Sequence, residues 1–400
     1  MNIKPVVISG AGPVGLVLAM RLGHMGIACT VLESSSELAR GLRASTFHPP
    51  TLDMLDAQGI TNGLIAAGLI APTWQVRMHT TGQYAEFDLS VLKNETAHPY
   101  RLQCEQWRLS ELLLAHIQKN LPHVQVNWNS PLIGVSQKDT SVNGQYQSPD
   151  GQLNQLEASF LVGADGGHST VRKQLNLEFD GLTFPETTIL ATTRFAFHAH
   201  LPELSYINYC WSESGTFSLL RLRDLWRVSI YPDEGESIEE ATSSTAVQQK
   251  MQRIWPRHEA YDVLEIRPYR IHQRVVKQYV TGRVVLVGDA AHLNSPSGGM
   301  GMNGGIHDAF NLSEKLGSIL HGDCGLEALA LYERQRRPIA ISHVLEQSGR
   351  NRARMQERDM SKRLAAMEEL QRKASDPVLH KAHLLNTSMI TGLRESAALI

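Results

Sequence analysis

The stretch GAGPVGLVLAMRLGHMGIACTVLE, residues 10–33, decides the fold of this chain. An apolar run at residues 6–8 precedes it and predicts a buried strand. After the glycine-rich turn, apolar residues recur every three or four positions, as on one face of a helix: Leu16, Ala19, Leu22 and Met25. The segment CTVLE, residues 29–33, then predicts a second strand. Residues 5–33 therefore predict a strand–helix–strand unit and, with it, an α/β fold.

The turn in this unit has the spacing G-x-G-x-x-G, formed by Gly10, Gly12 and Gly15, with Pro13 and Val14 between the last two. In dinucleotide-binding units, the first glycine permits a tight turn and the second lets the backbone approach a pyrophosphate. The third allows the helix to pack closely against the strand, and the N–H groups at the helix N-terminus attract the phosphates. The turn therefore predicts a dinucleotide site, with an ordinary structural turn as the alternative.

Glu33 ends the second strand, roughly 20 residues after the glycine turn, where such units place the acidic residue that binds a ribose hydroxyl. A carboxylate there disfavours a 2′-phosphate, so we expect FAD or NAD rather than NADP. A second glycine-rich stretch, GDAAHLNSPSGGMGMNGG, spans residues 288–305. Either the chain binds two nucleotides, or the two distant turns hold different parts of one long cofactor.

Composition and charge argue against several classes of function. With 400 residues the chain exceeds the usual size of one compact core, and its formal net charge of −2 argues against a nucleic-acid partner. The 4 cysteines show no paired spacing, so we expect neither a disulfide framework nor a metal site. The N-terminus has no signal-peptide pattern, and every apolar stretch is interrupted before it reaches membrane-spanning length. We therefore expect a cytoplasmic protein that does not associate with membranes.

The character of the sequence changes between residues 183 and 270. Short runs rich in β-branched and aromatic residues, such as TTRFAFHAH and WRVSIYP, are divided there by Gly, Asp, Glu and Pro. This pattern predicts a mostly antiparallel sheet inserted between α/β segments. After residue 305 the pattern is helical as far as the C-terminus.

Three blocks of sequence carry a resemblance to a known family. They are residues 10–33, LVGADGGHSTVRKQL at residues 161–175, and GDAAHLNSPSGGMGMNGGIHDAFNLSEKL at residues 288–316. With this order and spacing, the chain resembles the class A flavoprotein aromatic hydroxylases, the para-hydroxybenzoate hydroxylase family. Within that family, the stretches EIRPYRIHQRVV and WRVSIYP are most similar to para-nitrophenol and related phenol monooxygenases.

The resemblance implies that both glycine-rich stretches hold one FAD. The first block would bind the adenosine ribose and the pyrophosphate. Asp289, next to Gly288, would accept hydrogen bonds from the ribityl hydroxyls through its charged carboxylate. The loop that begins the next helix would lie along the isoalloxazine ring with these residues: Pro296, Gly299, Gly301, Met302 and Asn303. The positive end of that helix would stabilise the anionic reduced flavin.

The second block matches the family's Asp-Gly motif at Asp165 and Gly166, and Arg172 matches the motif's basic partner near the pyrophosphate, which is linked to the use of reduced nicotinamide. Arg43 and Gln106 fall where relatives place side chains toward the pyrophosphate and the ribityl chain. No second G-x-G-x-x-G is expected, because in this family NAD(P)H binds transiently, without a Rossmann domain of its own.

The implied reaction is the hydroxylation of a small electron-rich aromatic substrate: a phenol, an aminophenol or a heteroaromatic compound. NAD(P)H would reduce FAD, and O2 would react through a flavin C4a-hydroperoxide, so no metal is required. We expect the inserted sheet to form the floor of the substrate pocket. His48, Tyr209 and Tyr231 are candidates for contacting or deprotonating a substrate hydroxyl, and a packed or surface position is the alternative for each. Two other hypotheses are a related flavin-dependent reductase or halogenase, and a non-catalytic FAD-binding protein.

The expected fold class is α/β, with an FAD-binding Rossmann-like domain of the glutathione-reductase type, an inserted mostly antiparallel β-sheet domain and C-terminal helices. We expect the FAD-binding domain at residues 1–72, 101–182 and 270–345. The substrate-binding sheet is expected at residues 73–100 and 183–269, and the C-terminal helical region at residues 346–400. These last helices are candidates for covering the active site, for a homodimer contact or for a solvated face.

Overall fold

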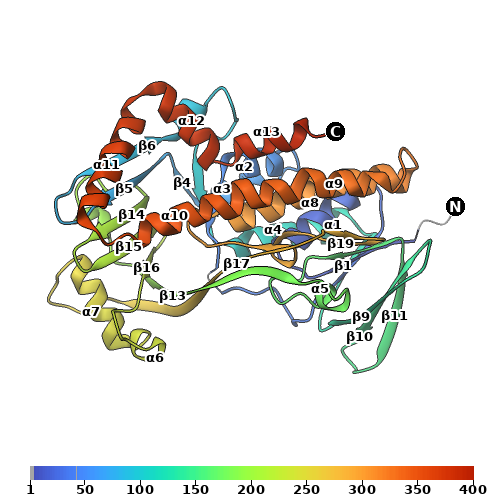
Figure 1. Cartoon of the computed structure of the whole chain (residues 1–400). Coiled ribbons are helices and arrows are strands. Elements are labelled where there is room, and N and C mark those ends of the chain that lie inside the picture. Colours follow the sequence, from blue (N-terminus) through green and yellow to red (C-terminus); the bar gives the residue numbers. More distant parts are fainter. Residues whose placement is uncertain (1–3, 42) are drawn as a thin grey trace.

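The structure, a computed structural model, describes residues 4–41 and 43–400. It contains a mainly parallel sheet, a larger, mainly antiparallel sheet, two smaller sheets and a series of helices toward the C-terminus (Figure 1). The predicted α/β fold class is therefore confirmed. None of the helices within the described residues is both long and apolar enough to cross a lipid bilayer.

The parallel sheet has β1 near its centre. Its strands lie in the order β18 (Val280–Thr281), β19 (Val284–Leu286), β12 (Phe160–Gly163), β1 (Val6–Ser9), β2 (Cys29–Leu32) and β8 (Val124–Asn127), and all but β18 run parallel. The chain leaves β1 toward β2 on one side and later reaches β12 on the other. In open α/β sheets, ligands bind at the carboxyl ends of strands beside such a reversal of strand order.

The pairing register makes four of these strands end at the same level. Ser9 lies opposite both Leu32 and Gly163, and Gly163 lies opposite Leu286. The residues that follow these strand ends belong to the three sequence blocks, including Glu33 after β2. The three blocks therefore meet at one edge of the sheet, although they are far apart in the sequence.

Helices and a small sheet complete the core around the parallel sheet. The helices in contact with one another are α1 (Pro13–His24), α4 (Gln106–Asn120), α8 (Met300–His321) and α9 (Glu327–Ile339). The small sheet consists of β9 (Leu132–Gln137), β10 (Val142–Gln147) and β11 (Leu153–Ala158). Gly144 of β10 faces Leu161 and Val7, so β10 packs directly on the parallel strands.

Shorter elements connect the two large sheets. A second small sheet consists of β3 (Thr46–Phe47), β7 (Arg101–Gln103) and β4 (Leu69–Ala71), with helices α2 (Pro49–Asp56) and α3 (Thr61–Ala67) between its strands. Helix α5 (Thr170–Gln174) follows β12. Helix α9 continues through a π-helical segment, Ala340–Leu345, into α10 (Glu346–Gln356).

The large sheet has eight strands. Their order is β20 (His292–Leu293), β17 (Val263–Val276), β13 (Phe179–Thr193), β16 (Trp226–Ile230), β15 (Gly215–Arg221), β14 (Ile207–Ser212), β5 (Thr73–Met78) and β6 (Tyr84–Asp88). Strands β13 and β17 continue without a break across residues 182/183 and 269/270. The domain boundaries that we placed at these residues stay a prediction.

The two faces of the large sheet bury different cores. One face, with Phe217 and Val228, packs against α6 (Ile238–Ala241) and α7 (Ser244–Ile254). The other face, with Trp74 and Trp211, packs against α11 (Met360–Ser375), α12 (Pro377–Thr387) and α13 (Ile390–Ala398). Figure 1 shows α6 and α7 on one side of this sheet and α11 and α12 on the other. The C-terminal helices therefore cover one face of the sheet.

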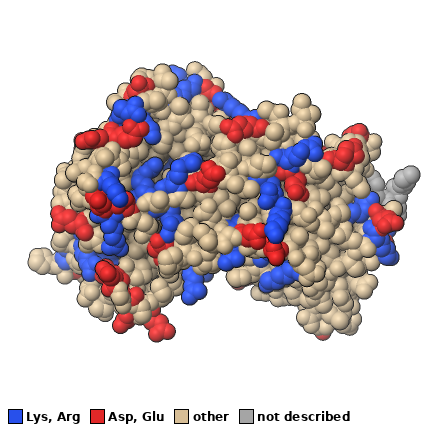
Figure 2. Space-filling view, in the orientation of Figure 1, with Lys and Arg blue, Asp and Glu red and all other residues tan. Residues whose placement is uncertain are grey.

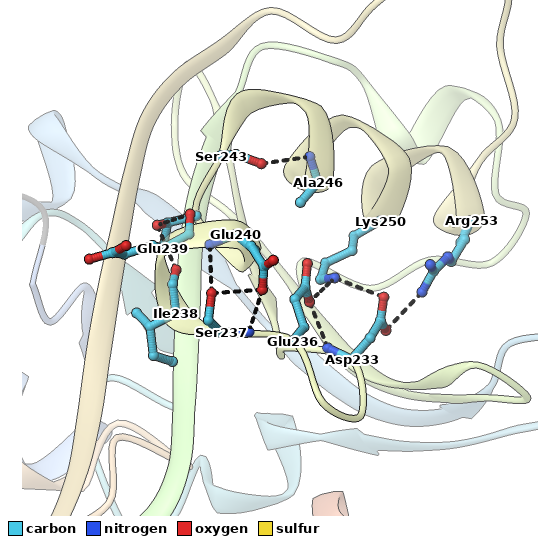
Figure 3. A network of polar contacts seen from close by, with 11 residues as sticks. Asp233, Glu236, Ser237, Ile238, Glu239, Glu240, Ser243, Ala246, Lys250 and Arg253 are labelled. Carbon is cyan, nitrogen blue, oxygen red and sulfur yellow. Dashed lines mark hydrogen bonds and ion pairs between the residues drawn. The ribbon is translucent and has the colours of Figure 1, made fainter.

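A buried lysine fixes the end of β16. Lys250 on α7 is 6% exposed, and its ammonium group donates to Asp233 Oδ2 at 2.9 Å and to Glu236 Oε2 at 2.6 Å (Figure 3). Arg253 donates to the other Asp233 oxygen at 2.9 Å. Because Asp233 lies two residues after Tyr231, this network holds the segment that carries a candidate substrate-binding side chain.

A second buried network joins α8 to β19 and α9. Asp308 is 0% exposed, and its Oδ1 accepts a hydrogen bond from Arg336 Nε at 2.7 Å. Its Oδ2 accepts from His292 Nε2 at 2.7 Å and from the Gly288 backbone N–H at 3.1 Å. Burial alone raises the pKa of the Asp308 carboxyl, but Arg336 and His292 lower it to about 2. The network therefore fixes the turn at Gly288 to the helix that follows it.

We predict that Asp308→Ala lowers the free energy of unfolding by about 3–5 kcal/mol, because it leaves the buried Arg336 charge without its partner. Urea unfolding followed by circular dichroism measures this change. Glu314→Ala on the same helix is the control, because the Glu314 side chain is 61% exposed. The control should lose about 1 kcal/mol or less.

The loss in Asp308→Ala should also depend on pH. The carboxyl has a lower pKa when folded, about 2, than its ordinary value of 3.8, so its contribution is present above about pH 4 and is lost as the pH falls toward 2. The difference between wild type and variant should shrink over that range. A difference that stays constant would contradict the assigned network.

Candidate active site

The first block forms a turn that glycine alone can make. Gly10 has φ +105°, and a Cβ there would lie 2.5 Å from the Ala164 carbonyl oxygen. A Cβ at Gly15 would lie 2.0 Å from the Gly10 carbonyl oxygen, so the helix packs closely on the strand. A Cβ at Gly12, by contrast, would meet nothing within 4 Å. The backbone at Gly12 is therefore accessible, as close approach of a pyrophosphate requires.

Glu33 lies beside this turn, at the end of β2. Its Oε2 accepts a hydrogen bond from the Ala11 backbone N–H at 2.8 Å, and its Oε1 accepts from the Ser35 N–H at 2.9 Å. The carboxylate therefore holds the glycine turn against β2. It remains half-buried, and its Oε1 also accepts from the Ser34 hydroxyl at 3.2 Å, so Oε2 is the oxygen with a lone pair for a further donor.

The second block lies directly beside the first. Asp165 Oδ2 accepts from the backbone N–H groups of Thr170 at 2.8 Å and Val171 at 3.1 Å, which begins helix α5. Its Oδ1 is buried and has no hydrogen-bond partner among the described residues. Gly166 has φ +76°, a conformation that glycine adopts without strain.

Arg172 connects the second block to the third. Its guanidinium donates to the Ala290 carbonyl at 3.1 Å and to the Gly167 carbonyl at 2.8 Å, and it stacks 3.9 Å above the Phe179 ring. The structure therefore gives this arginine a role that holds backbone segments together. Its predicted role near the pyrophosphate stays a prediction.

The third block packs against the first through Val14. A Cβ at Gly288 would lie 3.2 Å from Val14 Cγ2, and one at Gly305 would lie 2.7 Å from the same atom. Asp289 is exposed to solvent, yet burial among neighbouring groups raises the pKa of its carboxyl, and His292 and Arg43 partly offset the rise. Its carboxylate makes no hydrogen bond to any of the residues that the structure describes.

The loop that follows Asp289 leads into α8. Gly299 begins the helix with φ +67°, and no side chain caps the N-terminus. Asn303 Oδ1 accepts from the His48 backbone N–H at 3.0 Å, and its Nδ2 donates to the Thr46 carbonyl at 2.8 Å. Asn303 thus joins the start of α8 to β3. Three further predicted residues of this segment lie partly or fully buried: Pro296, Gly301 and Met302.

His48 is fully buried beside this loop. Its Nε2 donates to the Gly298 carbonyl at 2.9 Å, while its Nδ1 has no partner among the described residues. Burial, and then the charge of Arg101, keep the pKa of His48 well below its ordinary value. The imidazole is therefore neutral, and it supports the backbone at Gly298.

Arg43 and Gln106 lie near one another through Ala44. Arg43 is exposed, and its charge acts on Asp289. Gln106 is the first residue of α4, and its backbone N–H donates to the Ala44 carbonyl at 3.0 Å. Arg43 therefore lies near Asp289 of the third block, and Gln106 lies beside Ala44, the residue that follows Arg43.

The face of the large sheet that meets the C-terminal helices carries the other candidates. Tyr209 on β14 is half-buried, and Tyr231 follows β16. Burial raises the pKa of the Tyr231 hydroxyl, which lies close to Thr188. Tyr231 therefore keeps its proton near neutral pH and can donate it in a hydrogen bond.

Tyr269, on β17 of the large sheet, lies close to Asp289. It is 38% exposed, yet burial raises the pKa of its hydroxyl, and the charges of Asp289 and Arg227 both act on it. Arg227, in turn, lies close to Tyr209. Tyr269 therefore lies near both Asp289, after β19, and Arg227, on β16 of the large sheet.

Sequence reasoning missed three arginines around Tyr209: Arg101, Arg227 and Arg354. One signal was available for Arg227, because it alternates with the apolar Trp226 and Val228 in a strand-like run and so faces away from their core. Arg354 stands among many other charged residues in its helix, and the sequence does not distinguish it from a solvated arginine.

Comparison with known proteins assigns the family. A family model described as FAD binding domain matches residues 4–347. The chain is 31% identical to para-nitrophenol 4-monooxygenase of Pseudomonas sp. (strain WBC-3) over 97% of this chain and 96% of that protein. It is 33% identical to 6-hydroxy-3-succinoylpyridine 3-monooxygenase of Pseudomonas putida over 86% of this chain and 87% of that protein. The crystal structure of p-nitrophenol 4-monooxygenase from Pseudomonas putida matches with a TM-score of 0.91 and 30% identity, over 98% of each chain.

The chain therefore belongs to the FAD-binding domain family. Within it, the protein is an FAD-dependent aromatic monooxygenase, which uses NAD(P)H and O2 to hydroxylate a small aromatic substrate. The predicted class of enzyme and its cofactors are thereby confirmed. The reductase, halogenase and non-catalytic alternatives are set aside. The roles of the individual site residues stay predictions.

We predict that Gly12→Ala leaves the stability of the apoprotein unchanged within about 0.5 kcal/mol, because its methyl group meets no neighbour. The same change should weaken FAD retention, because it fills the space through which a pyrophosphate would approach. Gly15→Ala should lower both the stability of the apoprotein and the retention of FAD, because its methyl group would lie 2.0 Å from a carbonyl oxygen. Absorbance of the purified protein measures the FAD content, and urea unfolding measures the stability. Wild-type retention in Gly12→Ala would rule out this placement.

Proposed function

We propose that FAD lies along the carboxyl edge of the parallel sheet. The adenosine ribose would lie at Glu33, the pyrophosphate at residues 10–15 and Asp165, and the ribityl chain at Asp289. The flavin ring would lie next to residues 296–303. The observation that carries this proposal is the direct contact among the three blocks, at Gly10 with Ala164 and at Val14 with Gly288.

The donors and acceptors at this edge fit the cofactor. The accessible backbone at Gly12 suits a pyrophosphate, and the carboxylate of Asp289, which has no partner among the described residues, suits a row of hydroxyl groups. The N–H groups in the first turn of α8 are free of side-chain caps, so they favour negative charge on a bound ring. We therefore assign these residues, with Arg43 and Gln106 beside them, to cofactor binding.

FAD, reduced by NAD(P)H, supplies the oxygen chemistry that hydroxylates the ring. The residues of this chain bind and orient the substrate and exclude water from it. The large sheet presents Tyr209 and Tyr231 from one face, and helices α10 to α12 cover that face. Arg227 lies beside the proposed cofactor edge, because its guanidinium donates to the Arg43 carbonyl at 2.6 Å, so we assign it to the stabilisation of a negatively charged substrate oxygen.

The substrate that fits best is a monocyclic hydroxylated aromatic compound, a phenol or a hydroxypyridine. Two relatives with high coverage are named for such compounds, a nitrophenol and a hydroxypyridine. His48 is the weakest of the three predicted candidates for a substrate contact, because its Nε2 already supports the Gly298 carbonyl.

The test of this proposal is direct. The purified protein should contain FAD, and NAD(P)H oxidation should rise with a phenol or hydroxypyridine from a test panel. The product should contain one oxygen atom from ¹⁸O₂. A protein without flavin would overturn the cofactor site. A flavoprotein that produces only H₂O₂ with every compound of the panel would overturn the substrate class.

We predict that Asp289→Ala raises the dissociation constant of FAD roughly 10-fold or more, because the ribityl hydroxyls lose a charged acceptor worth on the order of 1.5–3 kcal/mol. Fluorescence titration of the apoprotein with FAD measures it. Asp323→Ala, on the exposed turn after α8, is the control and should leave the constant unchanged. Unchanged affinity in Asp289→Ala would remove this residue from the cofactor site.

Homodimer formation and a cytoplasmic location remain predictions. Light scattering coupled to gel filtration measures the mass in solution and tests the first of them.

A further inference from the structure

Two histidines meet at the C-terminal end of α1, away from the glycine turn at its other end. His24 is the last residue of α1, and His116 lies on α4. Their Nε2 atoms are 2.8 Å apart, and the two rings are nearly perpendicular, with an angle of 79° between their planes. His24 is exposed and His116 is half-buried, so solvent reaches the pair.

Neighbouring amides determine which ring nitrogens carry a hydrogen. Gln58, in the turn after α2, holds its Oε1 2.9 Å from His24 Nδ1. Because a carbonyl oxygen only accepts, His24 Nδ1 donates, and His24 Nε2 keeps the lone pair through which histidine binds metals. Asn120 Nδ2 donates to His116 Nδ1 at 3.3 Å, so His116 Nε2 carries the hydrogen that it donates to His24. His24 thus has an oxygen acceptor behind its ring, as metal-binding histidines have.

The distance between the two Nε2 atoms fits two adjacent ligands of one metal ion. Metal–imidazole bonds are about 2.0–2.1 Å long, so two nitrogens at 90° around a metal lie roughly 2.9 Å apart, and two at the tetrahedral angle roughly 3.3 Å. The observed 2.8 Å is close to the first of these values. Square-planar and tetragonal coordination by nitrogen and oxygen is typical of Cu²⁺ and Ni²⁺, and imidazole suits both ions.

The end of α1 also favours a cation. Carbonyl oxygens at a helix C-terminus carry partial negative charge. Two further histidines bind such oxygens here: His123 Nε2 donates to the Gly23 carbonyl at 2.8 Å, and His321 Nε2 donates to the Met25 carbonyl at 3.1 Å. These bonds use the Nε2 atoms of His123 and His321, whereas those of His24 and His116 are directed at each other.

We propose that His24 and His116 bind one Ni²⁺ or Cu²⁺ ion, which joins the end of α1 to α4. Among the described residues, no group of three or more histidine, cysteine or acidic side chains is placed to hold a metal ion, so water completes the coordination. The two ligands are 92 positions apart in the sequence, which is why cysteine spacing gave no sign of them. The site goes beyond the proposed function, since the ion would take no part in hydroxylation.

Binding requires only rotation within the pair. The His116 N–H now points at His24 Nε2, whereas a metal needs both lone pairs directed at one point. The χ2 torsion of histidine is broad, so each ring can tilt at little cost. His116 moves its hydrogen to Nδ1, and the exposed Asn120 amide turns its oxygen to accept it.

The experiment uses the FAD-loaded enzyme without a histidine tag and titrates it with NiCl₂ in a calorimeter. We expect saturation at about one Ni²⁺ per chain, with no competition from Mg²⁺, which prefers oxygen ligands. Ni²⁺ should also raise the midpoint of thermal unfolding, because the two histidines are held together only in the folded chain. Figure 2 shows acidic side chains scattered among basic ones on one face of the molecule, so this face attracts cations weakly.

His24→Gln and His116→Gln should each raise the dissociation constant of Ni²⁺ roughly 10-fold or more, because each removes one of two nitrogen ligands. Gln58→Leu should raise it roughly 10-fold, because it removes the acceptor that orients His24. His258→Gln is the matched control, since His258 is exposed in the loop after α7, and it should keep the wild-type constant. The FAD content of each variant is the check on folding and should not change.

Two outcomes would overturn the proposal. One is a titration that shows no saturable site for Ni²⁺. The other is wild-type affinity in both His24→Gln and His116→Gln, which would mean an adventitious ion only, bound elsewhere on the surface. Neither outcome affects the proposed function, which depends on flavin content and on hydroxylation of an aromatic substrate.

Discussion

The candidate site depends on one constraint, the in-register pairing of parallel strands. Hydrogen bonding between β1, β2, β12 and β19 makes their carboxyl ends level, so whatever follows each strand is delivered to the same edge. The glycine turn, Glu33, the Asp-Gly motif and Asp289 each follow one of these ends within a few residues. A shift of register in any one pair would move its motif away from the others. The pairing of the strands in the sheet therefore determines where the proposed cofactor site lies.

Close backbone contacts and buried polar groups then keep the blocks together. The space between the blocks at Gly10 and Gly305, and within the first block at Gly15, is so narrow that a single methyl group would clash with a neighbour. Around this contact, Asp308 ties the Gly288 turn to α8, and Arg172 ties the second block to the third. Because each of these polar groups is buried and paired, breaking one would leave its partner unsatisfied, so the edge is rigid before any ligand binds.

The proposed substrate site is formed differently, by one face of the large sheet and the C-terminal helices that pack on it. Alternate residues on β14 face the C-terminal helices, and the Trp211 indole N–H holds the Arg354 carbonyl of α10 over β14. Within the described part of the chain, Arg101, Arg227 and Arg354 form no ion pair, whereas Lys250, on the opposite side of the same sheet, is paired with two carboxylates.

The sequence by itself determined the strand–helix–strand unit, the three cofactor blocks and the family. Each of these depends on local spacing, and the glycine positions follow from backbone geometry that needs no distant partner. Only the tertiary structure decided that Arg101, Arg227 and Arg354 surround Tyr209, and that His48 supports Gly298. Those groups come from different strands and helices, and their meeting depends on packing between elements that no local pattern encodes. The fold could therefore be predicted from the sequence. The residues around the proposed substrate site could be identified only from the tertiary structure.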